Sequence, residues 1–391
     1  MNFETVELTP EQLSFVDEAR AFFEENWHPD PEMAAMLSLE HDRLPADFAE
    51  LLASRGWIRP QSPVDEGGAG LGTIEARLLS ELYGEYGVPK TNGSDLLSST
   101  IEKYASERVR AEALADIKRG TKTVCLGYSE PDSGSDMAAA RISAVQDGDT
   151  WVINGSKMWT TYAHQSDYVF LLARTGPIEE KHRTLTVFLV PLDTPGIEVQ
   201  AIWAMGEVRT NTVYYTDVRI SDDYRLGPVN QGWRVVSEPL AVEHGIEDDL
   251  DALAPINGSM GSEFSHTLEL TIDAAVEWAA TTTDSNGRPL VEDPIVRATL
   301  AEALLELEVA RNSPGETGKV AAAEALIRQA DVLVDLAGPA GILDEGVPGA
   351  SRRGILSWSR LHSPGTAIYG GTSEIYRNNI AKGALGLPRP Y

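Results

Sequence analysis

The alternation of apolar and polar positions divides the chain into three parts, the first of them helical. Thr9-Pro10-Glu11-Gln12 predicts a helix start, with Thr as the cap, Pro as the first helical residue and Gln three positions after the cap. Apolar residues then recur at helical spacing. Further helices are predicted over residues 47–54, 73–86 and 94–115. We therefore expect a helical N-terminal domain over residues 1–121.

From about residue 122 the pattern changes to short apolar runs bounded by Gly, Pro or Asp, which is typical of strands. Asn154-Gly155 predicts a hairpin turn, and Asp147-Gly148-Asp149 predicts a second turn just before it. No helical segment alternates with the strands, so we expect an antiparallel β domain over residues 122–230. The predicted strands cover residues 151–153, 156–159, 168–173, 185–191 and 212–220.

After Gly232 the chain is again rich in Ala, Leu and Glu, and long helices are predicted over residues 264–280, 294–311 and 319–337. Their length is sufficient for a helical bundle over residues 231–391. The expected fold class is therefore α+β, in the order helical, β and helical, without an internal repeat.

Composition excludes several classes of function. The 391 residues include 42% hydrophobic and 24% charged positions, as in an ordinary globular protein. A net charge of −28 argues against nucleic acid or an anionic membrane as a main partner, and for local basic residues wherever an anionic ligand binds. The single cysteine, Cys125, excludes an internal disulfide and a thiolate zinc cluster, and the seven histidines lack His-x-x-x-His spacing, so no metal site is expected.

The same composition bears on location. No apolar run reaches the roughly 18 residues that a membrane helix needs. Residues 1–25 lack a basic start followed by an apolar run, so we expect no signal peptide. The expected location is cytoplasmic, without a membrane partner.

Two segments carry candidate chemistry. Residues 128–136, Tyr-Ser-Glu-Pro-Asp-Ser-Gly-Ser-Asp, offer hydroxyls and a glycine-spaced backbone that can surround an anion or a carbonyl edge. In Met158-Trp159-Thr160-Thr161, strand spacing would place Trp159 and Thr161 on one face. An aromatic side chain can stack on a flat heterocycle, and a hydroxyl beside it can hydrogen-bond to the polar edge of that heterocycle. Alone, either segment is also explained as a turn or a core aromatic residue.

Together with a C-terminal segment, these residues resemble the acyl-CoA dehydrogenase family. Its members carry Thr-Glu-Pro-x-Ala-Gly-Ser-Asp, then Trp-x-Thr after Asn-Gly, then a closing Gly-Thr-Ser-Glu-Ile-x-Arg. The corresponding residues here are 129–136, 159–161 and 371–377, in the same order, and Leu385-Gly386-Leu387-Pro388 matches as well. The resemblance covers almost the whole chain. It implies a helical N-terminal domain, a β-barrel-like middle domain and a C-terminal four-helix bundle, with FAD between the last two.

The resemblance also implies an activity, the α,β-dehydrogenation of an acyl-CoA thioester to the trans-2-enoyl-CoA, and a set of site residues. Tyr128, Ser129, Gly134 and Ser135 would contact the flavin or the acyl-CoA. Trp159 and Thr161 would flank the isoalloxazine ring, and Thr372 and Glu374 would contact the pyrophosphate and adenosine of FAD. Residues 371–377 also have the pattern of a capped helix start, which is a natural phosphate site.

The catalytic base departs from the commoner family pattern. In many relatives it is a Glu directly before Gly-Thr-Ser, where this chain has Gly370, whose N–H can still polarise the thioester carbonyl. Other relatives place a Glu-Arg pair on the first helix after the β domain, and the matching residues are Glu243-His244. The resemblance therefore assigns the base to Glu243 and a substrate contact to His244. Glu247, one turn on, is the rival base, and a solvated helix residue is the other interpretation of Glu243.

A second departure concerns the subunits. Relatives carry an Arg before Phe-Gly-Arg-Pro, and a Gln-x-x-Gly-Gly segment, that reach the FAD of a neighbouring subunit. This chain has no Arg in residues 281–286 and reads Asp335-Leu336-Ala337-Gly338-Pro339 at the second position. The pattern resembles actinobacterial steroid side-chain acyl-CoA dehydrogenases, which pair two different subunits.

This resemblance implies an α2β2 heterotetramer in which this chain is the catalytic subunit, and otherwise a homotetramer. It further implies a bulky or steroid side-chain acyl group and an electron-transfer flavoprotein as electron acceptor. An acyl-CoA oxidase that uses oxygen and a flavin-free, non-catalytic subunit remain open alternatives. The sequence does not identify the acyl group.

Overall fold

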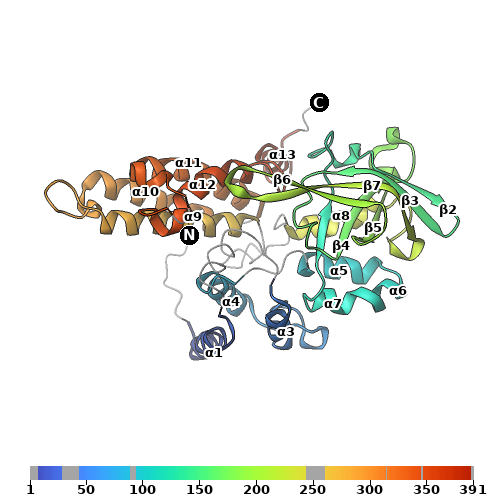
Figure 1. The fold of residues 1–391 in the computed structure, drawn as a ribbon, viewed down its shortest axis with the longest axis horizontal. Helices are drawn as coiled ribbons and strands as arrows, with labels where there is room; N and C mark the ends of the chain where they lie inside the picture. Colours follow the sequence, from blue (N-terminus) through green and yellow to red (C-terminus); the bar gives the residue numbers. More distant parts are fainter. Residues whose placement is uncertain are drawn as a thin grey trace. The chain divides into compact units, whose positions relative to one another are not determined.

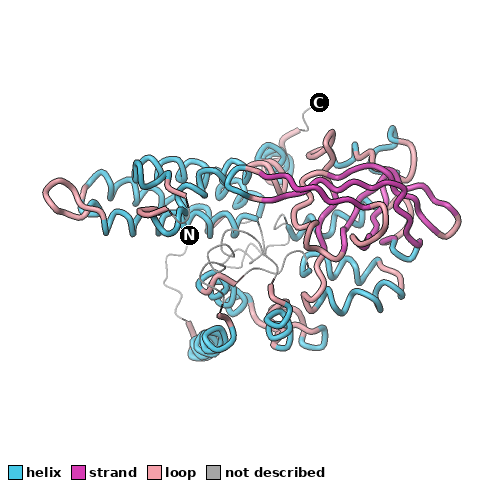
Figure 2. Tube along the Cα trace, in the orientation of Figure 1, coloured by secondary structure: helices cyan, strands magenta, loops and turns pink. Residues whose placement is uncertain are grey.

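The computed structural model describes residues 8–28, 44–88, 94–243, 260–313, 315–344 and 347–388. The chain divides into two compact units. Figure 1 shows the chain coloured along the sequence, and Figure 2 shows it coloured by secondary structure. The first unit comprises Met1–Asp132, Ala138–Ala201 and Asn211–Val236; the second comprises Ser133–Met137, Ile202–Thr210 and Ser237–Tyr391. The three-domain boundaries expected from the sequence, after residues 121 and 230, stay a prediction.

The N-terminal part of the first unit consists of helices around an aromatic core. Helix α1 begins as predicted, because the Thr9 hydroxyl accepts a hydrogen bond from the Gln12 N–H at 3.3 Å and the Gln12 side chain accepts one from the Thr9 N–H at 3.0 Å. Phe22, Phe23 and Trp57 are buried in contact with one another. The helices are α1 (Pro10–Asn26), α3 (Ala46–Ser54), α4 (Thr73–Glu85) and α5 (Ser94–Tyr104).

The single helix predicted over residues 94–115 is interrupted. Helix α5 ends at Tyr104, and the Ser106 hydroxyl accepts a hydrogen bond from the Val109 N–H at 3.2 Å, which caps a new helix start. The new segment consists of α6 (Glu107–Val109), a π-helical turn (Arg110–Leu114) and α7 (Ala115–Lys118). The apolar periodicity continues across the break, and only the serine marks it.

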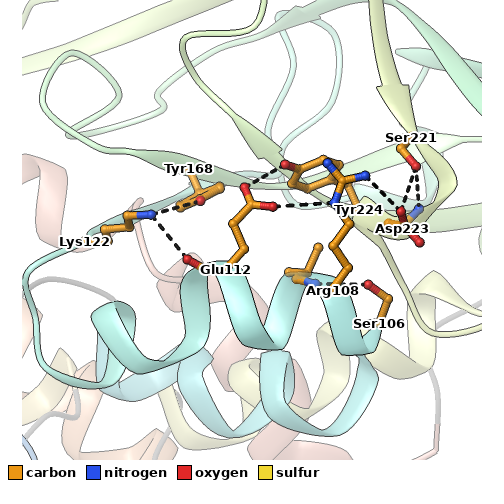
Figure 3. Close-up of polar contacts among 9 residues, drawn as sticks. Ser106, Arg108, Glu112, Lys122, Tyr168, Ser221, Asp223 and Tyr224 are labelled. Atoms are coloured by element: carbon orange, nitrogen blue, oxygen red, sulfur yellow. Dashed lines mark hydrogen bonds and ion pairs between the residues drawn. The ribbon is translucent and has the colours of Figure 1, made fainter.

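Polar contacts join this segment to the sheet of the same unit (Figure 3). The Tyr224 hydroxyl donates to the Glu112 carboxylate at 2.8 Å, and Arg108 pairs with Asp223 at 3.1 Å. Burial, with Glu112 beside it, raises the pKa of Tyr224 to about 12, so the hydroxyl keeps its proton and remains a donor. These contacts fix the short helices against the β8 end of the sheet.

The sheet has the strand order β6-β7-β3-β2-β4-β5-β8, and β1 pairs with β4. Pairing is mostly antiparallel, but β1 and β4 are parallel, and Ser143 of β2 pairs with Arg174 of β4 in parallel. The expected antiparallel β domain therefore also contains two parallel strand pairs. The strands are β1 (Val124–Gly127), β2 (Ser143–Asp147), β3 (Thr150–Lys157), β4 (Tyr168–Arg174), β5 (Leu185–Pro191), β6 (Ile197–Trp203), β7 (Arg209–Ser221) and β8 (Arg225–Leu226).

Strand β3 continues through Asn154-Gly155, so the hairpin predicted there is wrong. Asn154 exchanges two hydrogen bonds with Asp217 of β7, its amide donating at 3.1 Å and its oxygen accepting from the Asp217 N–H at 2.8 Å. The pairing register shifts at this point, as in a β-bulge. Gly155 has φ 138°, and a Cβ there would lie 3.0 Å from the Cα of Ile142. The β2–β3 turn is the predicted one at Asp147-Gly148-Asp149, with Gly148 at φ 65°.

The second unit contains the predicted helical bundle. Helix α11 (Gly315–Ala337) contacts α9 (Met260–Thr281), α10 (Pro294–Arg311), α12 (Ile355–Thr366) and α13 (Ser373–Gly383). Glycine allows α9 and α11 to approach closely, because a Cβ on Gly261 would lie 3.0 Å from the carbonyl carbon of Gly318. Helix α8 (Gly232–Glu243) precedes the bundle. In the part of the chain that the structure describes, no helix is long and apolar enough to cross a membrane.

Candidate functional site

A buried ion pair anchors the first candidate segment, residues 128–136. The Lys157 ammonium lies 2.9 Å from the Glu130 carboxylate, and the two side chains are 0% and 6% exposed. Glu130 also accepts hydrogen bonds from the N–H groups of Arg141 at 2.7 Å and Ile142 at 3.1 Å, and Lys157 donates to the Tyr128 carbonyl at 2.8 Å. The segment is therefore fixed to the end of β3.

Burial lowers the pKa of Lys157 to about 8, although the nearby Glu130 carboxylate acts in the opposite direction. A buried charge pair of this kind has a large desolvation cost and depends on both partners. Sequence reasoning missed Lys157, because a lysine within a short predicted strand is normally a solvated residue.

The second candidate segment is a turn and not a strand. Strand β3 ends at Lys157, Trp159 has φ 62°, and the Thr161 N–H donates to the Trp159 carbonyl at 3.0 Å. The prediction that Trp159 and Thr161 share a strand face is therefore wrong. Asn211 on β7 holds the turn, since its carbonyl accepts from the Thr160 N–H and its side-chain amide donates to the Thr160 carbonyl, both at 3.0 Å.

This geometry leaves the Trp159 indole 53% exposed, on a backbone conformation that typically costs about 1–3 kcal/mol. The side chain of the next residue, Thr160, is fully buried, and its hydroxyl has no hydrogen-bond partner among the described residues. An exposed aromatic plate on a strained turn is a feature of ligand sites.

The remaining predicted residues of these segments lie as follows. The Met158 N–H donates to the Ser129 carbonyl at 2.9 Å, so the structure brings the two segments of the first unit together. Gly134 and Ser135 are exposed, and a Cβ on Gly134 would meet no atom within 4 Å. Ser133 is 7% exposed, and its hydroxyl has no hydrogen-bond partner in the described part of the chain.

The third segment, in the second unit, is a glycine turn that leads into α13. Thr372 caps the helix, its hydroxyl accepting from the Ile375 N–H at 3.2 Å. Gly370 and Gly371 have φ 62° and 87°. A Cβ on Gly370 would lie 3.0 Å from the Cγ of Met260, so this backbone does not suit the Glu that many relatives carry here.

Buried side chains hold this turn. The Tyr376 hydroxyl donates to the Gly370 carbonyl at 2.7 Å, and the Lys319 ammonium donates to the Gly371 carbonyl at 2.6 Å. Sequence reasoning missed Lys319, although a single lysine within the Ala-rich start of α11 was a signal. Ser373 is 3% exposed, and its hydroxyl lacks a hydrogen-bond partner among the residues described, whereas Glu374 is exposed.

The predicted base is only partly placed. Glu243 is the last residue of α8, which continues through Pro239, and its side chain lies outside the described part of the structure. His244 and Glu247 lie outside the described residues as well. The choice between Glu243 and Glu247 stays a prediction. Within the described ranges, no group of three or more His, Cys, Asp or Glu residues could hold a metal ion.

Comparison with known proteins gives the family. Three domain descriptions match the chain: Acyl-CoA dehydrogenase N-terminal domain over residues 9–121, middle domain over residues 125–218 and C-terminal domain over residues 313–385. The chain is 32% identical to acyl-CoA dehydrogenase IpdE1 of Mycobacterium tuberculosis, over 86% of this chain and 85% of that protein. It is also 29% identical to acyl-CoA dehydrogenase FadE26 of the same organism, over 98% of this chain and 99% of that protein.

A solved structure agrees. The ChsE4-ChsE5 complex from Mycobacterium tuberculosis contains a chain that superposes with a TM-score of 0.83 at 28% identity, covering 99% of this chain and 100% of that one. The expected fold class, with its helical N-terminal, β and helical C-terminal domains, is confirmed. The chain therefore belongs to the acyl-CoA dehydrogenase family of FAD-dependent oxidoreductases that act on CH–CH groups, and it is an acyl-CoA dehydrogenase.

Proposed function

We propose that this chain is the catalytic subunit of a heteromeric acyl-CoA dehydrogenase that acts on a bulky, ring-bearing acyl-CoA and passes electrons to an electron-transfer flavoprotein. The observation that carries the proposal is the turn at Gly370 and Gly371. It has no side chain where many relatives carry their base, and its left-handed backbone at φ 62° and 87° disfavours any residue but glycine.

The described residues fit FAD. The half-exposed Trp159 indole offers a face for a flat ring system, and the buried hydroxyls of Ser133, Thr160 and Ser373 have no hydrogen-bond partners among the described residues. When bound, FAD supplies the acceptor for the hydride that leaves the substrate β-carbon. We propose that the residues that contact it are Tyr128, Ser129, Gly134, Ser135, Trp159, Thr161, Thr372 and Glu374.

The protein's own groups act on the substrate α-carbon and its thioester. We propose that the Glu243 carboxylate takes the α-proton, with Glu247 as the alternative base. The Gly370 N–H donates a hydrogen bond to the thioester oxygen, where negative charge develops as the proton leaves; one such donor is typically worth about 2.7–4 kcal/mol. Ser135 and His244 are the proposed substrate contacts.

The Gly370 turn also favours a large acyl group. We propose that a large acyl group takes the room that a glutamate occupies in other family members, where the flexible Met260 side chain lies 3.0 Å from the position of a Gly370 Cβ. The similarity to a solved steroid acyl-CoA dehydrogenase, Tcur3481-Tcur3483, with a TM-score of 0.84 at 25% identity, supports a steroid side chain as substrate. A panel of acyl-CoA thioesters graded by chain length and ring content tests this proposal. We expect the highest kcat/KM for ring-bearing substrates, and a preference for straight short chains would contradict the proposal.

The turn between α9 and α10 is the basis for proposing a second subunit. The Asp284 carboxylate accepts from the N–H groups of Asn286 at 2.7 Å and Arg288 at 3.0 Å, and pairs with the Arg288 guanidinium at 2.9 Å. These donors lower the pKa of Asp284 to about 2. Relatives place an arginine near this turn for a neighbour's FAD, whereas here an aspartate engages the guanidinium of Arg288. We propose an α2β2 heterotetramer in which the related subunit supplies the missing cation.

The experiment is to purify the chain alone and with its partner, and to count bound FAD by absorbance against mass from light scattering. We expect two FAD per α2β2 tetramer and weak FAD binding by the chain alone. A stable homotetramer with four tightly bound FAD and full activity would contradict the heteromer. Stoichiometric hydrogen peroxide on turnover would favour an oxidase, and a protein that stays colourless with its partner would favour a non-catalytic subunit.

A further inference from the structure

We propose that Lys319 and Tyr376 are positioning residues for FAD: they hold the carbonyl groups of the Gly370-Gly371 turn so that the N–H groups at the start of α13 are presented to the diphosphate. The proposal rests on the proposed function, in which Thr372 and Glu374 contact this part of FAD. It adds two buried side chains that need not touch the cofactor.

Lys319 is 1% exposed and is held in a defined position. Its ammonium donates to the Thr366 carbonyl at 3.0 Å and to the Gly371 carbonyl at 2.6 Å. It lies 5.7 Å from the centroid of the Phe264 ring and 5.0 Å from that of Tyr376. Carbonyl oxygens and aromatic faces both stabilise a cation away from water. The ammonium is thereby fixed between the last residue of α12 and the turn before α13.

Tyr376 holds the neighbouring peptide group. It is 1% exposed, and its hydroxyl donates to the Gly370 carbonyl at 2.7 Å. Its ring also lies against Gly371, where a Cβ would be 2.8 Å from the Cε2 atom of Tyr376. The two side chains therefore hold two consecutive carbonyl groups of one turn.

The direction of the following N–H groups is a consequence of peptide geometry. In a planar trans peptide the C=O of one residue and the N–H of the next point in opposite directions, and the described residues contain no cis peptide. With the carbonyls of Gly370 and Gly371 held by Tyr376 and Lys319, the N–H groups of Gly371 and Thr372 point away from these two side chains. Neither N–H has a hydrogen-bond partner among the described residues.

A second observation indicates that the start of α13 binds a ligand. The Ser373 hydroxyl is buried in the first turn of α13 without a hydrogen-bond partner in the part of the chain described. Buried polar groups are nearly always hydrogen-bonded in native proteins. Two outward N–H groups, an unpaired buried hydroxyl and the positive end of a helix dipole together suit an anionic diphosphate.

The test measures FAD affinity separately from stability. The complex of this chain with its partner subunit is freed of FAD and titrated with it, and a melting curve is recorded for each apoprotein. Lys319→Met keeps the chain length but removes the donor, and Tyr376→Phe removes only the hydroxyl. Lys382→Met, which changes an exposed lysine on α13, is the matched control.

We expect the Kd for FAD to rise at least about tenfold in Lys319→Met, because a hydrogen bond from a charged donor no longer orients the turn. Tyr376→Phe should raise it by about two- to tenfold, as expected for a neutral hydrogen bond. Lys382→Met should match the wild type. A purely structural role would lower the melting temperatures and leave the Kd unchanged, and that result would overturn the proposal.

If Lys319→Met does not fold, Tyr376→Phe decides: a raised Kd supports the positioning role, and a wild-type Kd overturns it. Failure of the proposed function is distinguishable, because the wild-type complex would then bind no FAD at all. That result would overturn both proposals, whereas equal Kd values for wild type and variants would overturn only this one.

Discussion

Two buried lysines, one in each unit, each hold a candidate segment of their own unit, and they do so by different means. Lys157 is paired with the Glu130 carboxylate at 2.9 Å and fixes a loop to a strand. Lys319 donates to the carbonyls of Thr366 and Gly371 and lies over two aromatic rings, and it fixes a turn to a helix. The first is a contact between full charges, and the second is a contact between a charge and dipoles.

The difference predicts different sensitivities. The loss of one full charge from a buried pair leaves the other uncompensated, which is costly for the fold. The loss of a cation from neutral carbonyls leaves polar groups that water or a ligand can satisfy, which is less costly. We therefore expect the Lys157 contact to govern stability and the Lys319 contact to govern ligand affinity.

The largest effect is expected at Glu130. Glu130→Ala leaves the Lys157 ammonium buried and also removes the acceptor of the N–H groups of Arg141 and Ile142. We expect the free energy of unfolding, measured by urea denaturation, to fall by about 3–5 kcal/mol. The control is Asp147→Ala in the exposed pair with Arg219, whose side chains are 63% and 60% exposed. That change should lower the free energy of unfolding by no more than about 1 kcal/mol. If both variants lost a similar amount of stability, the buried Glu130–Lys157 pair would not govern stability as we expect.

A smaller effect is expected at Gly370. Gly370→Ala places a side chain at φ 62° and within 3.0 Å of Met260, so we expect the free energy of unfolding to fall by about 1–3 kcal/mol. Gly383→Ala is the matched control, because Gly383 lies in α13 with no atom within 4 Å of its Cβ position and should lose nothing. A Gly370→Ala variant as stable as wild type would show that the turn is less constrained than described.

The smallest effect is a dependence on pH. The pKa of Lys157 is lowered from an ordinary value of 10.5 to about 8, so above pH 8 the folded protein releases a proton that the unfolded chain keeps up to about pH 10.5. Stability rises with pH wherever the unfolded state binds more protons. Relative to Lys157→Met, wild type should therefore gain stability between pH 8 and 10.5. A difference that stays constant or falls across this window, in unfolding curves of both proteins, would argue against a lowered pKa.

The sequence predicted the helices well, because capping residues and periodicity act locally. Thr9 and Gln12 form the capping box that the sequence indicated, and the helix predicted over residues 294–311 has the observed bounds of α10. Strand β6 was missed, although Ile197, Val199 and Ala201 alternate with polar residues, because its exposed face resembles a loop. Asn154-Gly155 was misassigned because the pairing of Asn154 with Asp217, 63 residues away, decides its conformation.

The candidate site was predictable as motifs but not as geometry. The sequence indicated that Trp159 and Thr372 matter. It did not indicate that Asn211 holds the Trp159 turn or that Lys319 holds the turn before Thr372. These supporting residues are distant in sequence from what they position, and only tertiary packing brings them there.

The central claim, that Glu243 removes the α-proton from an acyl-CoA, is tested most directly by the flavin absorbance after anaerobic mixing of the FAD-loaded complex with a ring-bearing acyl-CoA. We predict that the flavin band of the wild type is bleached and that Glu243→Gln, with FAD still bound, is bleached at least about 10²–10⁴-fold more slowly. The claim would be contradicted if the flavin of Glu243→Gln were bleached at the wild-type rate and the flavin of Glu247→Gln were not bleached. That result would assign the base to Glu247, one turn further along the chain.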